Sequence, residues 1–143
     1  MTVAAPVRPP EMKGADGAGA KAAATYFMEL ATYAMGSGDL TEWAVVSGQT
    51  CRFCDGVRGV VETAYGAHHR IEGRTVDVND AEVLGQDPQV GVYSVRLGYS
   101  LTESSEIDQS GALVYAFPAE EGEIIIDVQP SLRGWLLIGG DGQ

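Results

Sequence analysis

The sequence predicts an α+β domain, in which about three N-terminal helices pack on one face of a curved antiparallel sheet of four to five strands. Apolar residues recur three and four positions apart between residues 20 and 68, which is the spacing of amphipathic helices. Beyond residue 73 they recur mostly at every second position, as in strands with one buried face. With 143 residues, the chain is long enough for one domain with a single core.

The first segment, residues 1–19, is expected to be a flexible linker, because prolines and glycines stand among its alanines. A linker at this end is typical of a tether, although a ragged chain end would look the same. The folded domain is expected over residues 20–139. Residues 140–143 are expected to be a frayed tail, because all four are glycine or polar.

The first helix is expected over residues 20–35, where aromatic and aliphatic residues recur at helical spacing. The glycine-rich stretch 36–38 is expected to end it. Asp39 followed by Glu42 has the pattern of a capping box, and predicts a short second helix.

The only two cysteines, Cys51 and Cys54, lie at the start of a third expected helix, which Thr50 would cap and which would run to about His68. A structural disulfide is the preferred interpretation. A redox-active dithiol is an alternative, but it would need a preceding strand, and here the preceding segment is helical. A zinc site is a further alternative, but His68 and His69 would lie about 20 Å away along the same helix. Free thiols remain the last alternative.

The second half of the chain predicts strands over residues 76–84, 90–101, 113–117, 123–128 and 132–138, with a bulge near residues 93–94. Turns or irregular segments are expected at residues 86–88, 102–110, 120–122 and 129–131. The last two strands would form a hairpin.

A sheet curled around a helix leaves a cone-shaped cavity between the layers, a shape that resembles the NTF2-like (cystatin-like) fold. If the cavity is present, aromatic side chains are the residues expected to line it, since ligand pockets are largely apolar. More often, such residues are simply part of the core. The candidates are Tyr26, Tyr33, Trp43, Tyr65, Tyr93, Tyr99, Tyr115 and Trp135.

The charge of the chain is acidic, with 9 basic and 20 acidic residues and a net charge of −11. Phosphate backbones and anionic lipid surfaces repel such a chain, so nucleic acid and a polybasic membrane contact are not expected as partners. No apolar run approaches the roughly 20 residues that cross a bilayer. No signal peptide is visible either, which indicates a cytosolic protein or a chain trimmed of its export signal.

Several segments resemble the actinobacterial lipoproteins grouped under domain of unknown function 6318. They are residues 9–14, 26–34, 38–39, 51–54, 71–73 and 134–135. The most specific of them is the Cys-x-x-Cys pattern after a tyrosine-rich helix and a Gly-Asp. The resemblance implies an exported NTF2-like domain, held to the membrane only through an acylated cysteine upstream of the linker. That cysteine is absent from this sequence, and the family brings no known activity, so no catalytic residue is carried over.

Catalytic residues are not predicted. Alternation along the first strand points Asp77 to solvent, and His68 and His69 close a helix, where positive charge is favourable. The acidic run 103–108 lacks the ligand spacing and central glycine of a calcium-binding EF-hand loop. Neither a metal nor a cofactor is expected.

The expected function is therefore that of a non-catalytic, extracytoplasmic domain that binds an apolar or amphipathic small molecule, or a protein partner, at the cell envelope. One alternative is an NTF2-like isomerase or hydrolase with an Asp or His base in the cone. Another is a thiol redox protein. Dimerisation through the open face of the sheet is expected by analogy with this fold alone.

Overall fold

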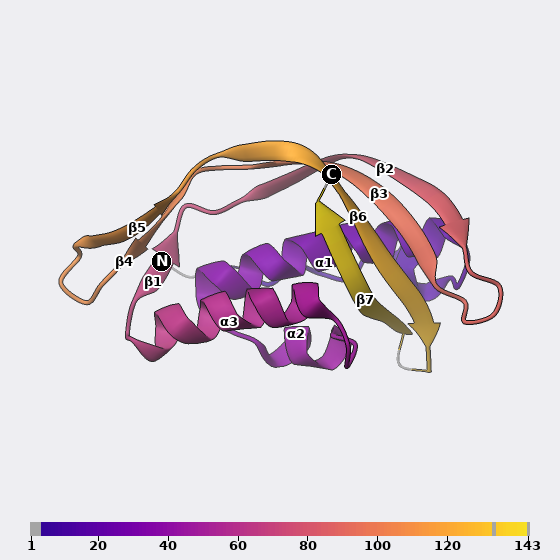
Figure 1. Cartoon of the computed structure of the whole chain (residues 1–143), viewed down its shortest axis with the longest axis horizontal. Helices are drawn as coiled ribbons and strands as arrows, with labels where there is room; N and C mark the ends of the chain where they lie inside the picture. Colours follow the sequence, from indigo (N-terminus) through magenta and orange to yellow (C-terminus); the bar gives the residue numbers. More distant parts are fainter. Residues whose placement is uncertain (1–3, 133, 143) are drawn as a thin grey trace.

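The computed structural model describes residues 4–132 and 134–142. Helices come first and strands follow, as expected (Figure 1). The helices are η1 (Pro10–Lys13, a 3-10 turn), α1 (Gly17–Ser37), α2 (Thr41–Val46) and α3 (Arg52–Gly66). The strands are β1 (Arg70–Glu72), β2 (Val76–Gln86), β3 (Tyr93–Leu101), β4 (Ser104–Ile107), β5 (Leu113–Phe117), β6 (Glu120–Ser131) and β7 (Gly134–Gly142).

Helix α1 is the central element of the core. Asp16 caps its N-terminus by accepting a hydrogen bond from the Gly19 N–H at 2.9 Å. Gly38 ends it in the left-handed conformation, with φ of 78°, and donates its N–H to the carbonyl of Ala34. The expected helix and its glycine stop are thus confirmed, and the cap at Asp16 starts the helix three residues earlier than the apolar spacing predicts.

Residues 10–19, which the sequence predicts as linker, are instead folded against the domain. Met12 is only 6% exposed, and the indole N–H of Trp135 donates to its carbonyl oxygen at 2.9 Å. A Cβ atom on Gly19 would lie 1.9 Å from the carbonyl oxygen of Gly14, so the two backbones are in close contact. A single apolar residue between prolines and glycines has no periodicity, and sequence spacing therefore could not place it.

Both short-range capping predictions differ from the structure by one residue. Asp39 accepts a hydrogen bond from the Thr41 N–H at 3.0 Å, but the residue at the cap position of α2 is Leu40. Cys51 rather than Thr50 caps α3, because its sulfur accepts from the Cys54 N–H. The helices themselves are present where the sequence predicts them.

The larger sheet is antiparallel, with strand order β2-β3-β6-β7. It curves around α1 (Figure 1). Inward side chains of its three other strands are fully buried, whereas those of the edge strand β2 are partly buried. Fully buried examples are Val95, Leu97, Ile126, Val128 and Leu137. The sheet's last strand extends to Gly142, which pairs with Ile124, so the expected frayed tail is part of β7 up to that residue. Gln143 lies outside the described residues.

A second sheet, of strand order β1-β4-β5, was not expected. It continues the first sheet in register, because Leu101 pairs with Glu120 and Ser104 then pairs with Phe117. Strands β3 and β4 therefore form one side of a long two-stranded ribbon, and β6 and β5 form the other. The ribbon arches over the helices and bends where the strands are interrupted (Figure 1). We call this bend, at residues 73–75, 102–103 and 118–119, the crease.

Two predictions were wrong at the crease and beside it. Residues 102–110 contain the strand β4, and residues 120–122 begin β6 instead of forming a turn. The strand β1 had no sequence signal and was not predicted. Backbone pairing with neighbouring strands, which needs no apolar side chain, holds these polar stretches in the sheets. The sheet therefore has more strands than alternation alone can reveal.

Thr102 fixes the geometry of the crease. Its N–H donates to the Thr75 carbonyl at 3.1 Å, and its hydroxyl oxygen accepts from the Thr75 N–H at 2.9 Å. The same hydroxyl donates to the carbonyl of Gly73, whose φ of 88° suits glycine. Pro118, between β5 and β6, has no N–H to give to the ladder.

Candidate functional site

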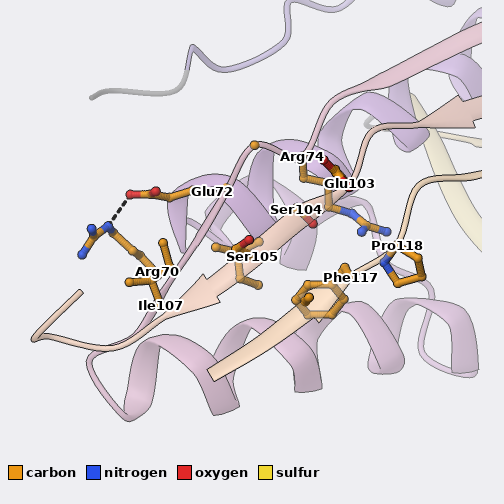
Figure 2. Close-up of a pocket in the computed structure, with 13 residues that line it drawn as sticks. Arg70, Glu72, Arg74, Glu103, Ser104, Ser105, Ile107, Phe117 and Pro118 are labelled. Carbon is orange, nitrogen blue, oxygen red and sulfur yellow. Dashed lines mark hydrogen bonds and ion pairs between the residues drawn. The ribbon is translucent and has the colours of Figure 1, made fainter. Parts of the chain in front are cut away.

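A cavity of about 830 Å³ lies at the crease, and we call it the crease cavity (Figure 2). Its walls come from strands β1, β4 and β5 and from residues next to their ends. Gly36, near the end of α1, also lines it. Its lining includes Arg70, Glu72, Arg74, Glu103, Ser104, Ser105, Ile107, Phe117 and Pro118.

Strand register divides the lining side chains of the second sheet between its two faces, with Ile71, Ser104 and Phe117 on one of them. The other face carries the remaining lining residues of these strands. Arg70 pairs with Ile107, while Glu72 pairs with Ser105, which in turn pairs with Ala116 on the other side. Directly paired residues of neighbouring strands project to the same face of a sheet. This face therefore presents a mixture of apolar surface, hydroxyl and charge to the cavity.

Two of the lining charges neutralise each other. The Nε atom of Arg70 lies 2.5 Å from a carboxylate oxygen of Glu72, and both side chains are about half exposed (Figure 2). An exposed pair of this kind contributes little to stability, about 0–1 kcal/mol. It leaves Arg74 and Glu103 as the remaining charged residues of the described lining.

Arg74 is half-buried, and its guanidinium carbon lies 5.8 Å from the ring centroid of Phe117. Among the described residues, no carboxylate lies within ion-pair distance of it. Burial lowers the pKa of the Arg74 guanidinium, and the charges of Glu120 and Tyr99 partly oppose that effect. A cation in this position favours a negatively charged or polarisable neighbour.

Ser104 is a buried polar residue of the lining. It is 4% exposed, and its hydroxyl oxygen has no hydrogen-bond partner in the described part of the chain. Leaving a buried hydroxyl unpaired costs about 1–3 kcal/mol, so such groups usually face a water or a ligand.

A second and smaller cavity, of about 260 Å³, lies between the sheet and helices α1 and α3, and we call it the inner cavity. Its walls are mostly apolar and include Met28, Met35, Val57, Leu101 and Ile124. Arg74 lines both cavities, and Tyr99 and Glu120 line the inner one. The space between the layers that the sequence predicts is thus small, and the larger cavity lies beyond it at the crease.

The aromatic candidates do not line the crease cavity. Tyr26, Trp43 and Trp135 are core residues, 1–3% exposed. The indole N–H of Trp43 donates to the carbonyl of Cys54 at 3.1 Å, as that of Trp135 does to Met12.

The other tyrosines tie segments together or face solvent. The hydroxyls of Tyr33, Tyr65 and Tyr93 donate to Asp39, to the carbonyl of Met35 and to the carbonyl of Ala15, respectively. Tyr115 is 53% exposed, with its ring edge-on to Phe117 at 4.6 Å between centroids.

The residues that do line the crease cavity, above all Arg74 and Phe117, were missed by sequence analysis. From the sequence, Arg74 between Gly73 and Thr75 is expected to be a loop residue, and Phe117 an ordinary strand residue. The useful signal was Pro118, since a proline after a strand marks the place where pairing stops and a sheet can bend.

Cys51 and Cys54 form a disulfide, which confirms the preferred interpretation of the cysteines. They are 1% and 3% exposed, in contact with the core cluster. Thiol–disulfide exchange requires access of a thiolate to one of the sulfur atoms, and burial of both opposes it. The bridge fixes the turn between α2 and α3, as a structural disulfide would.

The histidines and Asp77 lie outside both cavities. His69 contacts a carboxylate oxygen of Glu106 through Nδ1 at 2.7 Å, while His68 is exposed and has a positive φ of 63°. Asp77 is exposed and pairs with Ser100. In the described residues, no group of three or more His, Cys, Asp or Glu side chains could hold a metal ion.

Together, these features define an α+β domain with three α-helices packed against two antiparallel sheets and a cavity where the sheets meet. The chain belongs to the family of unknown function DUF6318, which it matches over residues 2–138.

The fold is similar to that of a solved region of a chloroplast protein. A crystal structure of the intermembrane space region of the chloroplast protein ARC6 superposes with a TM-score of 0.60 at 12% identity, over 89% of this chain and 95% of that one. No curated protein matches the chain significantly. Over residues 4–132 and 134–142, no helix is long and apolar enough to cross a membrane.

Proposed function

We propose that this protein is a non-catalytic extracytoplasmic domain that binds a small apolar or amphipathic molecule in the crease cavity. The observation that carries the proposal is the cavity itself, of about 830 Å³, within the range of about 300–1,000 Å³ that is usual for ligand pockets. Its lining combines apolar side chains with a few polar groups, which is the composition such pockets have. Helices beneath a curved sheet further support an NTF2-like cone as the fold.

The proposed location rests on the cysteines. A stable disulfide is typical of oxidising compartments, because the cytosol keeps most thiols reduced. The Cys51–Cys54 bridge therefore supports export, and the family resemblance supports a lipid anchor upstream of the N-terminal segment. The similar ARC6 region is itself described as lying in an intermembrane space.

A second candidate, binding of a protein partner, is favoured by β5. This strand is at the edge of its sheet, and Leu113, Val114 and Tyr115 are 63%, 47% and 53% exposed. An edge strand with free backbone groups can pair with an extended segment of another chain.

A homodimer would use this same edge rather than the open face of the larger sheet. Among the described residues, that face carries seven acidic side chains around one arginine, and a two-fold axis would bring like charges together. They are Asp77, Asp80, Glu82, Glu121, Glu123, Asp127 and Asp141, around Arg96.

The proposal is tested with N-phenyl-1-naphthylamine, a neutral apolar dye that fluoresces when shielded from water. We expect saturable binding to the wild-type protein and a loss of at least tenfold in affinity in Ala116→Phe, since the larger ring would occupy the cavity. Ala112→Phe, at an exposed alanine that precedes the same strand, is the matched control and should bind as wild type. Equal binding by both variants would reject the crease cavity as the site.

A further inference from the structure

We propose that Arg74 is the anion anchor of the crease cavity, and that the ligand is a monocarboxylate whose apolar body lies along Phe117 and Ile71. This inference rests on the proposed function and names the chemical class of its ligand. It is carried by the position of Arg74, by its lack of an ion pair among the described residues, and by the charge balance of the lining.

The backbone holds Arg74 rigidly in the crease. Gly73 before it adopts a positive φ, and Thr75 after it is hydrogen-bonded to Thr102 through both its N–H and its hydroxyl. Arg74 lines both cavities, so it lies at their junction, and the hydrogen bonds beside it hold its backbone there. Pre-organisation of this kind reduces the entropy lost when a ligand binds.

Other arginines of this acidic chain show what Arg74 lacks. Four have a carboxylate within ion-pair distance: Arg8 with Glu42, Arg58 with Asp55, Arg70 with Glu72 and Arg96 with Glu82. Arg52 is exposed to water. Arg74 is half-buried, and among the described residues its positive charge faces the ring of Phe117 and the more distant Glu120, with no ion pair. A guanidinium that has lost water and has no ion pair gains most from a bidentate carboxylate.

The remaining charges of the cavity limit the ligand to one negative charge. The four charged residues of the lining are two arginines and two glutamates, so the described wall is neutral as a whole. Glu103 would repel a second anionic group, and Glu120 lies on the other side of Arg74 in the inner cavity. A polyanion such as a nucleotide is therefore disfavoured, whereas one carboxylate opposite Arg74 is not.

The rest of the lining suits the body of such a ligand. Phe117 and Ile71 provide apolar surface, and strand register places both on the same face as Ser104. The hydroxyl of Ser104, which has no partner among the described residues, is available to donate to a carboxylate oxygen. The site thus combines one cation, one hydroxyl donor and an apolar wall.

The experiment compares decanoate with decanol, two ligands that differ in charge but have the same chain, by titration calorimetry at neutral pH. For wild type we expect decanoate to bind at least about tenfold more tightly, because a hydrogen bond to a charged group is worth more than one to a neutral group. Arg74→Gln should abolish that preference and leave decanol binding within about twofold. Arg74→Lys should retain part of it. Arg52→Gln, which removes an exposed arginine, should bind both ligands as wild type does.

The outcomes separate the two proposals. If both ligands bind wild type equally, or if Arg74→Gln retains the preference, the anchor is rejected while the cavity remains a binding site. If neither ligand nor the neutral dye binds, the proposed function fails as well. Thermal melting of Arg74→Gln shows whether the variant is folded, and the unchanged decanol affinity is a second check on its structure.

Discussion

The indole N–H of Trp135 donates to the backbone carbonyl of Met12 at 2.9 Å, and so joins the last strand to the N-terminal segment. Both side chains are buried. Residues 10–14 are therefore part of the folded domain, although their composition is that of a linker.

This contact predicts a loss of stability on truncation of Met12. Met12→Ala should lower the free energy of unfolding by about 2 kcal/mol or more, because it removes a buried side chain and leaves a cavity. Val7→Ala is the control, since Val7 is 86% exposed and its truncation should cost little. Urea unfolding measures both, and equal stability of the two variants would contradict the packing of η1 on the domain.

Two glycines predict opposite effects of the same substitution. In Gly38→Ala the new Cβ would lie 2.8 Å from Cδ1 of Tyr65, at a residue with positive φ, so stability should fall by at least about 1–2 kcal/mol. In Gly56→Ala, on the exposed side of α3, the new Cβ meets nothing within 4 Å, and stability should rise by about 0.5–1 kcal/mol. Thermal or denaturant unfolding gives both values. A stabilised Gly38→Ala variant would show that α1 does not end as described.

The disulfide predicts a structural rather than a redox role. Replacement of Cys51 and Cys54 together by serine should lower the free energy of unfolding by about 2 kcal/mol, near the low end for disulfides because the closed loop is short. Dye binding in the crease cavity should be unchanged, since neither cysteine lines it.

In the native wild-type protein, a dithiol should reduce the bridge only slowly, because both sulfur atoms are buried. The rate is followed by alkylation and mass measurement, with the denatured protein as the control. Rapid reduction without unfolding would restore the thiol redox hypothesis.

Asp39 predicts a defined pH dependence. The N–H of Thr41 donates to its carboxylate and, together with the Thr41 and Tyr33 hydroxyls, lowers the pKa of Asp39 below the ordinary value of 3.8. A carboxylate with a lowered folded-state pKa stabilises the protein fully above its unfolded pKa, and the contribution is lost as pH falls through the folded value.

The wild-type protein should therefore lose more stability than Asp39→Asn on acidification across that window. Carboxyl NMR titration of Asp39 checks the direction of the shift, and a pKa above the ordinary value would contradict the hydrogen bonds described.

Local patterns predicted much of the fold because the responsible interactions are local. Apolar spacing along α1 and α3, and the glycine stop after α1, depend on residues within a turn or two of each other. Alternation in β2, β3 and β7 predicted those strands because one face of each is buried. The disulfide was the preferred interpretation because a redox dithiol lacked a preceding strand and a zinc site lacked further ligands within reach, and Cys51 and Cys54 are indeed bridged.

The candidate site was not predictable in the same way. Polar strands such as β4 exist because neighbouring backbones supply their hydrogen bonds, and their side chains carry little signal. Aromatic residues were expected at the cavity, yet most are in the core or bound to backbone carbonyls. Residues of the crease cavity come from four segments, at residues 36, 70–74, 103–107 and 116–118, and each is unremarkable alone.

The sequence by itself determined the α+β class of the fold, the succession of helices followed by strands, and the acidic charge, since these follow from composition and short-range spacing. It favoured the disulfide without determining it. Only the tertiary structure decided where the sheet bends, that Met12 packs under Trp135, and that Arg74 lies at a cavity without a carboxylate partner among the described residues. Those relationships depend on strand register and on contacts between distant segments, which no local pattern records.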